Sequence, residues 1–103
     1  MDKIAMLTEI LQANPNDAFA RYGLAMEHLG QGDHEKALAE FADVTARNPD
    51  YVPAYQMSAQ TLAKLHRNDE AIARLRAGLE AARHTNNGHA SSEMQALLDE
   101  LES

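Results

Sequence analysis

The chain has 103 residues, of which 45% are hydrophobic, and this is enough for the packed core of one domain. Cysteine is absent, which excludes disulfides and thiolate metal sites, and no apolar run approaches the roughly 18 residues of a membrane-spanning helix. The net charge of -7 opposes attraction to phosphate, so we expect no nucleic-acid partner and no membrane partner. The first residues lack a basic leader and a small-residue cleavage site, and a cytoplasmic location is therefore expected.

Glycines, prolines and cap-forming residues divide the chain into six predicted helices. The sequence Gly30-Gln31-Gly32-Asp33 is typical of a turn that ends one helix and begins the next. The proline of Asn48-Pro49 disfavours helical backbone in the residue before it. Four side chains could accept a free amide at a helix start, namely Asp17, Asp33, Asp50 and Asn68. The predicted helices cover residues 3–13, 17–30, 34–47, 51–65, 69–83 and 89–101.

Both terminal helices are expected to pack through one apolar face. Their large apolar residues follow the i, i+3, i+4, i+7 spacing of a half-buried helix, or close to it. These residues are Ile4, Leu7, Ile10 and Leu11 in the first helix, and Met94, Leu97, Leu98 and Leu101 in the last.

A repeat of 34 residues runs through the middle of the chain. Asn14-Pro15 recurs as Asn48-Pro49 at this offset, which is the length of a tetratricopeptide repeat. Small residues coincide with small ones and large with large: Ala20 with Ala54, Ala25 with Ala59, Ala37 with Ala71, Ala39 with Ala73, and Phe41 with Leu75.

The chain resembles the tetratricopeptide-repeat (TPR) family, in the form of a small bacterial-type protein. The family signature W-x2-L-G-x2-Y, then A-x3-F, then P is matched in the first repeat by Arg21, Leu24, Ala25, His28, Ala37, Phe41 and Pro49. The second repeat reads Tyr55, Ser58, Ala59, Leu62, Ala71 and Leu75. There Arg83 replaces the closing proline, so the junction before the last helix is expected to be longer.

The resemblance implies an all-α fold, a short TPR superhelix of about six antiparallel helices. Residues 1–103 would form a single TPR domain. Its parts would be an N-terminal half-repeat helix at 3–13, repeat one at 17–47, repeat two at 51–83 and a capping helix at 89–101.

In this family the first helix of each repeat lines a concave groove, and this implies a partner-binding face. On the 17–30 helix, packing is expected to use Ala20, Leu24, Ala25 and His28, which leaves a second apolar stripe of Phe19, Tyr22, Met26 and Leu29. A helix that is apolar nearly all round needs cover on both sides. The 51–65 helix would add Pro53, Gln56, Gln60 and Ala63, and the last helix Ala90, Met94 and Leu97.

These features predict a protein-protein interaction module, an adaptor or scaffold that binds a peptide or helix. The predicted contact residues are Phe19, Tyr22, Met26, Leu29, Gln56 and Gln60. Some relatives grip a partner's C-terminal carboxylate with lysine and asparagine, but Tyr22 and Met26 stand at those positions here. Recognition of that kind is therefore not expected.

No residue pattern points to catalysis, a cofactor or a metal. The five histidines show no i, i+4 pair on one helix, and no serine lies in a nucleophile-elbow sequence. Two alternatives to the adaptor stay open. The stripe of Phe19, Tyr22, Met26 and Leu29 could instead form a homodimer, as in a structural or regulatory subunit. A basic surface around Arg67, Arg74 and Arg76 could dock an acidic partner.

Overall fold

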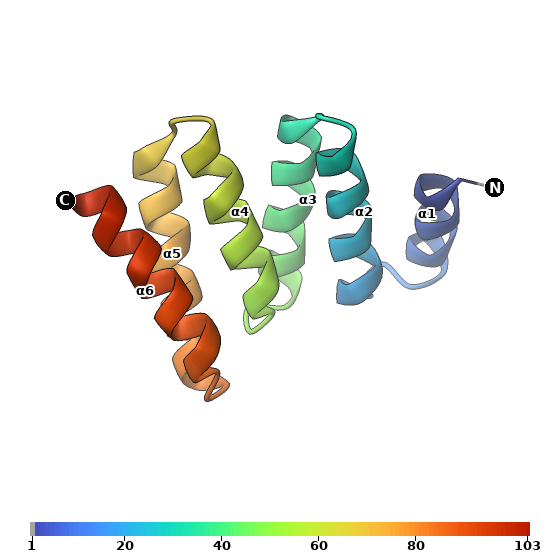
Figure 1. Cartoon of the computed structure of the whole chain (residues 1–103). Helices are drawn as coiled ribbons and strands as arrows, with labels where there is room; N and C mark the ends of the chain where they lie inside the picture. Colours follow the sequence, from blue (N-terminus) through green and yellow to red (C-terminus); the bar gives the residue numbers. More distant parts are fainter. Residues whose placement is uncertain (1) are drawn as a thin grey trace. The chain divides into compact units, whose positions relative to one another are not determined.

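The protein is all-α, as the sequence predicts. A computed structural model describes residues 2–103, and these form six α-helices without a strand (Figure 1). Every helix end lies within a residue of its predicted position, a difference within the usual uncertainty of helix boundaries. The helices are α1 (Lys3–Ala13), α2 (Ala18–Gly30), α3 (His34–Arg47), α4 (Val52–Lys64), α5 (Asn68–His84) and α6 (Gly88–Glu102).

The helices divide into two compact units, and the division falls between Asn48 and Pro49. The first unit contains α1, α2 and α3, and the second contains α4, α5 and α6. This division coincides with the turn that separates the two sequence repeats. None of the helices in residues 2–103 combines the length and apolar character needed to cross a membrane.

Side chains cap four of the helices at their N-termini. Asp17 accepts the backbone N–H of Ala20 at 2.9 Å, and Asp33 accepts that of Lys36 at 3.3 Å, as predicted. Asp2 and Asn87 make equivalent bonds to the amides of the third residue after them. Each bond satisfies one of the backbone donors that a helix start leaves free.

The predicted caps Asp50 and Asn68 are wrong. Tyr51 precedes α4 without a side-chain cap, and Pro53 lacks one of the N–H groups that would otherwise need a partner there. Asp50 instead lies 3.4 Å from Nδ1 of His84, measured from its Oδ1 atom. Asn68 is already helical, because the N–H of Ala71 donates to the carbonyl of Arg67.

The first unit has its apolar contacts on both sides of α2. Leu11 of α1 packs with Ala20 and Leu24 of α2, and the half-buried Ile4 and Leu7 lie against them. On the other side, α2 and α3 run antiparallel and adjacent in Figure 1. The signature residues Ala25, Ala37 and Phe41 are fully buried. Small residues allow close helix approach, and the phenyl ring fills the space beside them.

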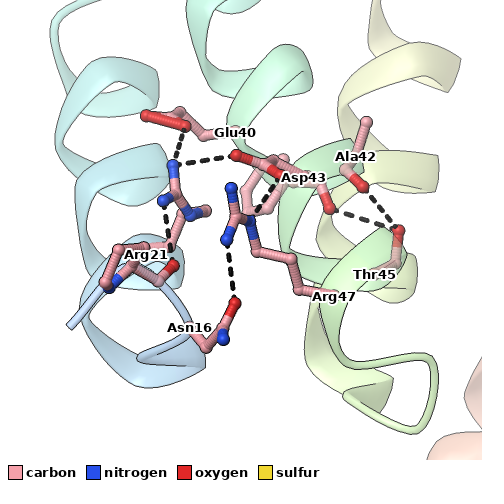
Figure 2. A network of polar contacts seen from close by, with 9 residues as sticks. Asn16, Arg21, Glu40, Ala42, Asp43, Thr45 and Arg47 are labelled. Atoms are coloured by element: carbon pink, nitrogen blue, oxygen red, sulfur yellow. Dashed lines mark hydrogen bonds and ion pairs between the residues drawn. The ribbon is translucent and has the colours of Figure 1, made fainter. Parts of the chain in front are cut away.

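A polar network closes the α2–α3 pair (Figure 2). Arg21, at the first signature position, places Nη1 3.1 Å from Oε1 of Glu40 and 2.9 Å from Oδ2 of Asp43. Asp43 also accepts a hydrogen bond from Nε of Arg47, whose Nη1 donates to Oδ1 of Asn16. The network therefore ties the turn before α2 to the last turns of α3.

The second unit has a continuous core shared by α4, α5 and α6. Its buried members include Tyr55, Ala59, Leu75, Met94 and Leu98. The phenol hydroxyl of Tyr55 donates to the carbonyl of Pro49 at 2.8 Å. These contacts join one residue from each helix to the same apolar cluster, so α6 is an integral part of this unit.

Gly78 of α5 lies where all three helices of the second unit meet. A Cβ atom built there would be 2.7 Å from Sδ of Met94 and 2.7 Å from Cβ of Tyr55. Both distances are shorter than real Cβ contacts. The absence of a side chain at Gly78 thus sets how closely α4 and α6 approach α5.

The expected longer junction before the last helix is wrong. Only residues 85–87 separate α5 from α6, whereas residues 48–51 separate α3 from α4. What lengthens instead is the helix, because α5 has 17 residues and α3 has 14. Arg83 has the backbone N–H that proline lacks, so nothing stops the helix where α3 ends.

Candidate functional site

The structure separates the two predicted faces of α2. Ala20, Leu24 and Ala25 of the expected packing face are buried, and His28 is half-buried. On the predicted partner face, Phe19 is 78% exposed, the largest value among the exposed large hydrophobic residues. The remaining three members of that stripe, Tyr22, Met26 and Leu29, are half-buried.

Tyr22 has a structural role as well as a place in the apolar stripe. Its ring centroid lies 5.7 Å from that of Phe41, with the planes inclined by 53°. Tilted rings at this distance attract each other beyond their burial alone. Substitution of Tyr22 would disturb the α2–α3 contact, whereas Phe19 can be changed with little effect on the fold.

The second unit has a groove of about 390 Å³ between α4 and α6. The predicted residues Gln56 and Gln60 line it from α4, and Leu97 lines it from α6. Leu75 of α5 is fully buried beneath. Nε2 of Gln56 donates to Oε1 of Glu93 across the groove at 2.9 Å.

Two of the groove contacts predicted for the last helix are wrong. Met94 is 1% exposed and Ala90 is also buried, because both belong to the core of the second unit. Sequence reasoning missed Glu93 and Glu100, which line the groove on either side of Leu97. The signal was present, since positions 93, 97 and 100 share one helical face.

The basic side chains of the second unit are largely engaged within it. Arg67 pairs with Glu70, Arg76 with Glu102, and Arg83 with Glu80. The Arg74 guanidinium lies 4.7 Å from the centroid of the Tyr55 ring, and burial lowers the pKa of Arg74. These contacts weaken the alternative of a basic docking surface.

A hollow of about 600 Å³ at the α5–α6 turn is the largest in the second unit, but it offers no free charge. Its two arginines, Arg76 and Arg83, already contact glutamates of α6 and α5. Across residues 2–103, His, Cys, Asp and Glu side chains nowhere gather in a group of three able to hold a metal ion. The smaller groove between α4 and α6 is therefore the better candidate.

Comparison with known proteins decides the family. The tetratricopeptide-repeat model matches residues 4–57 and residues 28–99, which together span nearly the whole chain. The chain belongs to the tetratricopeptide-repeat family. This confirms the resemblance inferred from the 34-residue offset. None of the curated proteins matches the chain.

Solved TPR structures are similar over most of the chain. A TPR domain protein from Salinibacter ruber, determined by NMR, is 36% identical, covers 86% of this chain and 90% of its own, and has a TM-score of 0.80. The TPR2B domain of yeast Sti1, in complex with pHsp70, is 21% identical with a TM-score of 0.86, covering 96% and 79%. The Yersinia enterocolitica type III secretion translocator chaperone SycD is 13% identical with a TM-score of 0.86, covering 96% and 69%.

Proposed function

We propose that this TPR chain is a protein-interaction module that binds a peptide or helix of another protein and catalyses no reaction. The observation that carries the proposal is Phe19, an aromatic ring that is 78% exposed beside a half-buried apolar stripe on α2. Exposed aromatic anchors beside apolar side chains are typical of the few residues that dominate binding energy. The stripe consists of Phe19, Tyr22, Met26 and Leu29.

The second unit supports the same function with different chemistry. Gln56 and Gln60 bring side-chain amides to the groove between α4 and α6. An amide has both donor and acceptor groups, so it can pair with the backbone of an extended peptide. Apolar contacts in one unit and polar contacts in the other suit a partner with both kinds of side chain.

Two proteins of the same fold illustrate the proposed role. The TPR2B domain of yeast Sti1 forms a complex with pHsp70, and SycD is a chaperone of type III secretion translocators. Their identities to this chain are 21% and 13%. They support the capacity of the fold to hold protein partners and do not identify the partner here.

The proposal is tested by selecting peptide ligands from a display library against the full chain and measuring their affinity by fluorescence anisotropy. Burial of a phenyl ring contributes about 1.5–3 kcal/mol. Phe19→Ser should therefore weaken the best peptide about tenfold or more, with no change in the thermal unfolding midpoint. Met6→Ser, an exposed apolar position on α1, is the matched control and should leave affinity unchanged.

If Phe19→Ser and Met26→Ser both bind the selected peptide as tightly as the unaltered chain, the stripe is not the contact. Circular dichroism of each variant separates loss of binding from loss of folding. This control matters most for Tyr22, whose ring also contacts Phe41.

A homodimer is the second candidate, and the exposure of Phe19 favours it equally. Small proteins often cover such a patch with a second copy through a two-fold interface. Light scattering of the chain across a range of concentrations distinguishes the two candidates. A dimer that Phe19→Ser converts to a monomer favours self-association, and a monomer at all concentrations favours the adaptor.

A further inference from the structure

The groove between α4 and α6 has acidic walls. Its only charged lining residues within the described chain are Glu93 and Glu100, both from α6. The helix α6 carries four acidic residues and no lysine or arginine. The single basic residue of α4, Lys64, lies in its last turn and does not line the groove.

The two carboxylates differ in what already holds them. Glu93 accepts the hydrogen bond from Gln56, which fixes its position at the edge of the groove. His89 also lies near it, with Nε2 at 3.5 Å from Oε1 of Glu93. Within residues 2–103, the Glu100 carboxylate makes no ion pair, whereas the neighbouring Glu102 is engaged by Arg76. Glu100 is thus available to an incoming cation.

Between the carboxylates the groove is apolar. Leu97 is half-buried on its wall, and Leu75 is fully buried below it. The volume of about 390 Å³ falls at the small end of ligand-binding pockets, which suits one or two side chains. An apolar centre with charge on both sides calls for an amphipathic occupant.

The charge of that occupant follows from desolvation. A partner that covers the groove removes water from both carboxylates, and such burial is costly unless a positive group or several donors replace the water. An acidic partner would add like-charge repulsion. A partner with lysine or arginine flanking an apolar side chain satisfies both requirements.

We propose that this groove binds a cationic amphipathic segment of another protein, with an apolar side chain against Leu97 and a basic side chain at Glu100. This rests on the interaction function proposed above and specifies its partner. Gln60, exposed at the same groove, would pair with the backbone of the bound segment.

The test uses two synthetic peptides that form the same amphipathic helix. One pairs leucine with lysine, and the other replaces every lysine by glutamate. Each is titrated into the isotope-labelled full chain, with amide shifts recorded by NMR and affinity measured by anisotropy at several salt concentrations. We expect the lysine peptide to bind, with the largest shifts at residues of the groove, and the glutamate peptide to bind at least about tenfold more weakly.

A matched pair of variants separates the groove from the overall charge. Glu100→Lys and Asp99→Lys change the net charge equally and neighbour each other on α6, but only Glu100 lines the groove. Glu100→Lys should weaken the lysine peptide about three- to tenfold and reduce its salt dependence. Asp99→Lys should change the affinity less than about twofold, within the range of an exposed charge. Leu97→Ser should weaken binding at every salt concentration.

Three outcomes would overturn the proposal. They are equal effects of Glu100→Lys and Asp99→Lys, equal binding of the two peptides, and shifts that avoid α4 and α6. Shifts confined to α2 around Phe19 would reject a cationic partner for the groove and leave the apolar stripe as the interaction surface. Failure of the proposed function is distinct, because it requires Phe19→Ser to be without effect on the selected peptides.

Discussion

Arg21 and Tyr55 each donate a hydrogen bond to the carbonyl oxygen of the proline six residues earlier in the chain. The donors are 34 residues apart, as are their acceptors Pro15 and Pro49. The second-helix contacts also coincide at this offset, since Arg21 pairs with Glu40 and Tyr55 lies under Arg74. The two repeats thus join their helices at the same point, one by an ion pair and the other by a cation–π contact.

Removal of the Arg21 side chain should destabilise the first unit. The side chain is only 14% exposed and contacts Glu40, Asp43 and the carbonyl of Pro15. Without it, two carboxylates lose their cation in a partly dry setting, which costs about 1–3 kcal/mol. Chemical denaturation of Arg21→Ala should show this decrease in the free energy of unfolding. No decrease would mean that water replaces the guanidinium at these carboxylates.

Transfer of the second repeat's chemistry to the first should restore part of that loss. Arg21→Tyr alone leaves Glu40 and Asp43 without a cation, and Glu40→Arg alone places two cations together. The double variant copies the Tyr55–Arg74 contact, which is worth about 0.5–2 kcal/mol in folded proteins. A double-mutant cycle should therefore give a favourable coupling energy. Strict additivity would show that the two contacts are not interchangeable.

The sequence predicts the helices well because their ends and buried faces depend on local residues. Gly32, Asp33 and Pro49 determine turns by their own backbone chemistry, and the alanines at helix crossings recur at a fixed offset. Helix length after Arg83 was harder to predict, because the lack of a breaker indicates only that a helix can continue.

The candidate site was less predictable, since it depends on which side of α6 faces its neighbours. Ala90, Met94 and Leu97 looked equivalent on an apolar face, but two of them are buried in the core. Only the packing of α6 against α4 and α5 shows that Glu93 and Glu100 border the groove. Helical periodicity limits the choice of faces and cannot select among them.

Gly78→Ala should destabilise the second unit. The added methyl would meet Sδ of Met94 and Cβ of Tyr55 at 2.7 Å, and the Tyr55 atom is next to the backbone and cannot move away alone. Overpacking of this kind costs about 1–3 kcal/mol, more than the helix propensity gained. Thermal unfolding monitored by circular dichroism measures the difference. Gly30→Ala is the control, because nothing lies within 4 Å of its Cβ position, and it should be neutral or slightly stabilising.

His66→Gly should stabilise the protein modestly. His66 has φ of 59° and stands 34 residues after Gly32, whose φ is 79°. A side chain in this left-handed region costs about 1–2 kcal/mol, and glycine returns about half of that through greater freedom when unfolded. We expect a net gain of about 0.5–1 kcal/mol by chemical denaturation.

The reverse substitution at the matching turn provides the comparison. Gly32→Ala should destabilise by about 1 kcal/mol, since nothing near its Cβ position could compensate. A stabilising effect of Gly32→Ala, or a loss on His66→Gly, would indicate that the turn changes its backbone conformation to suit the residue.

Two ion pairs on α5 should make the acid titration of their glutamates separable. The hydrogen bond from Arg67 lowers the pKa of Glu70, and that from Arg83 lowers the pKa of Glu80, both from the usual 4.5. A carboxylate whose pKa is lowered by folding stabilises the folded state above the unfolded pKa, and this contribution disappears as pH falls through the folded value. Both carboxylates are fully exposed, so the effect on total stability is small.

The site-specific pKa values are the sharper measurement, because each pair is the control for the other. NMR titration of the glutamate carboxyl carbons should show that Arg67→Met raises the pKa of Glu70 and leaves Glu80 unchanged. Arg83→Met should do the reverse. The pairs have opposite order along the helix, with arginine first in one and glutamate first in the other. If one substitution raises both pKa values, the shifts arise from the overall charge of α5 rather than from the individual hydrogen bonds.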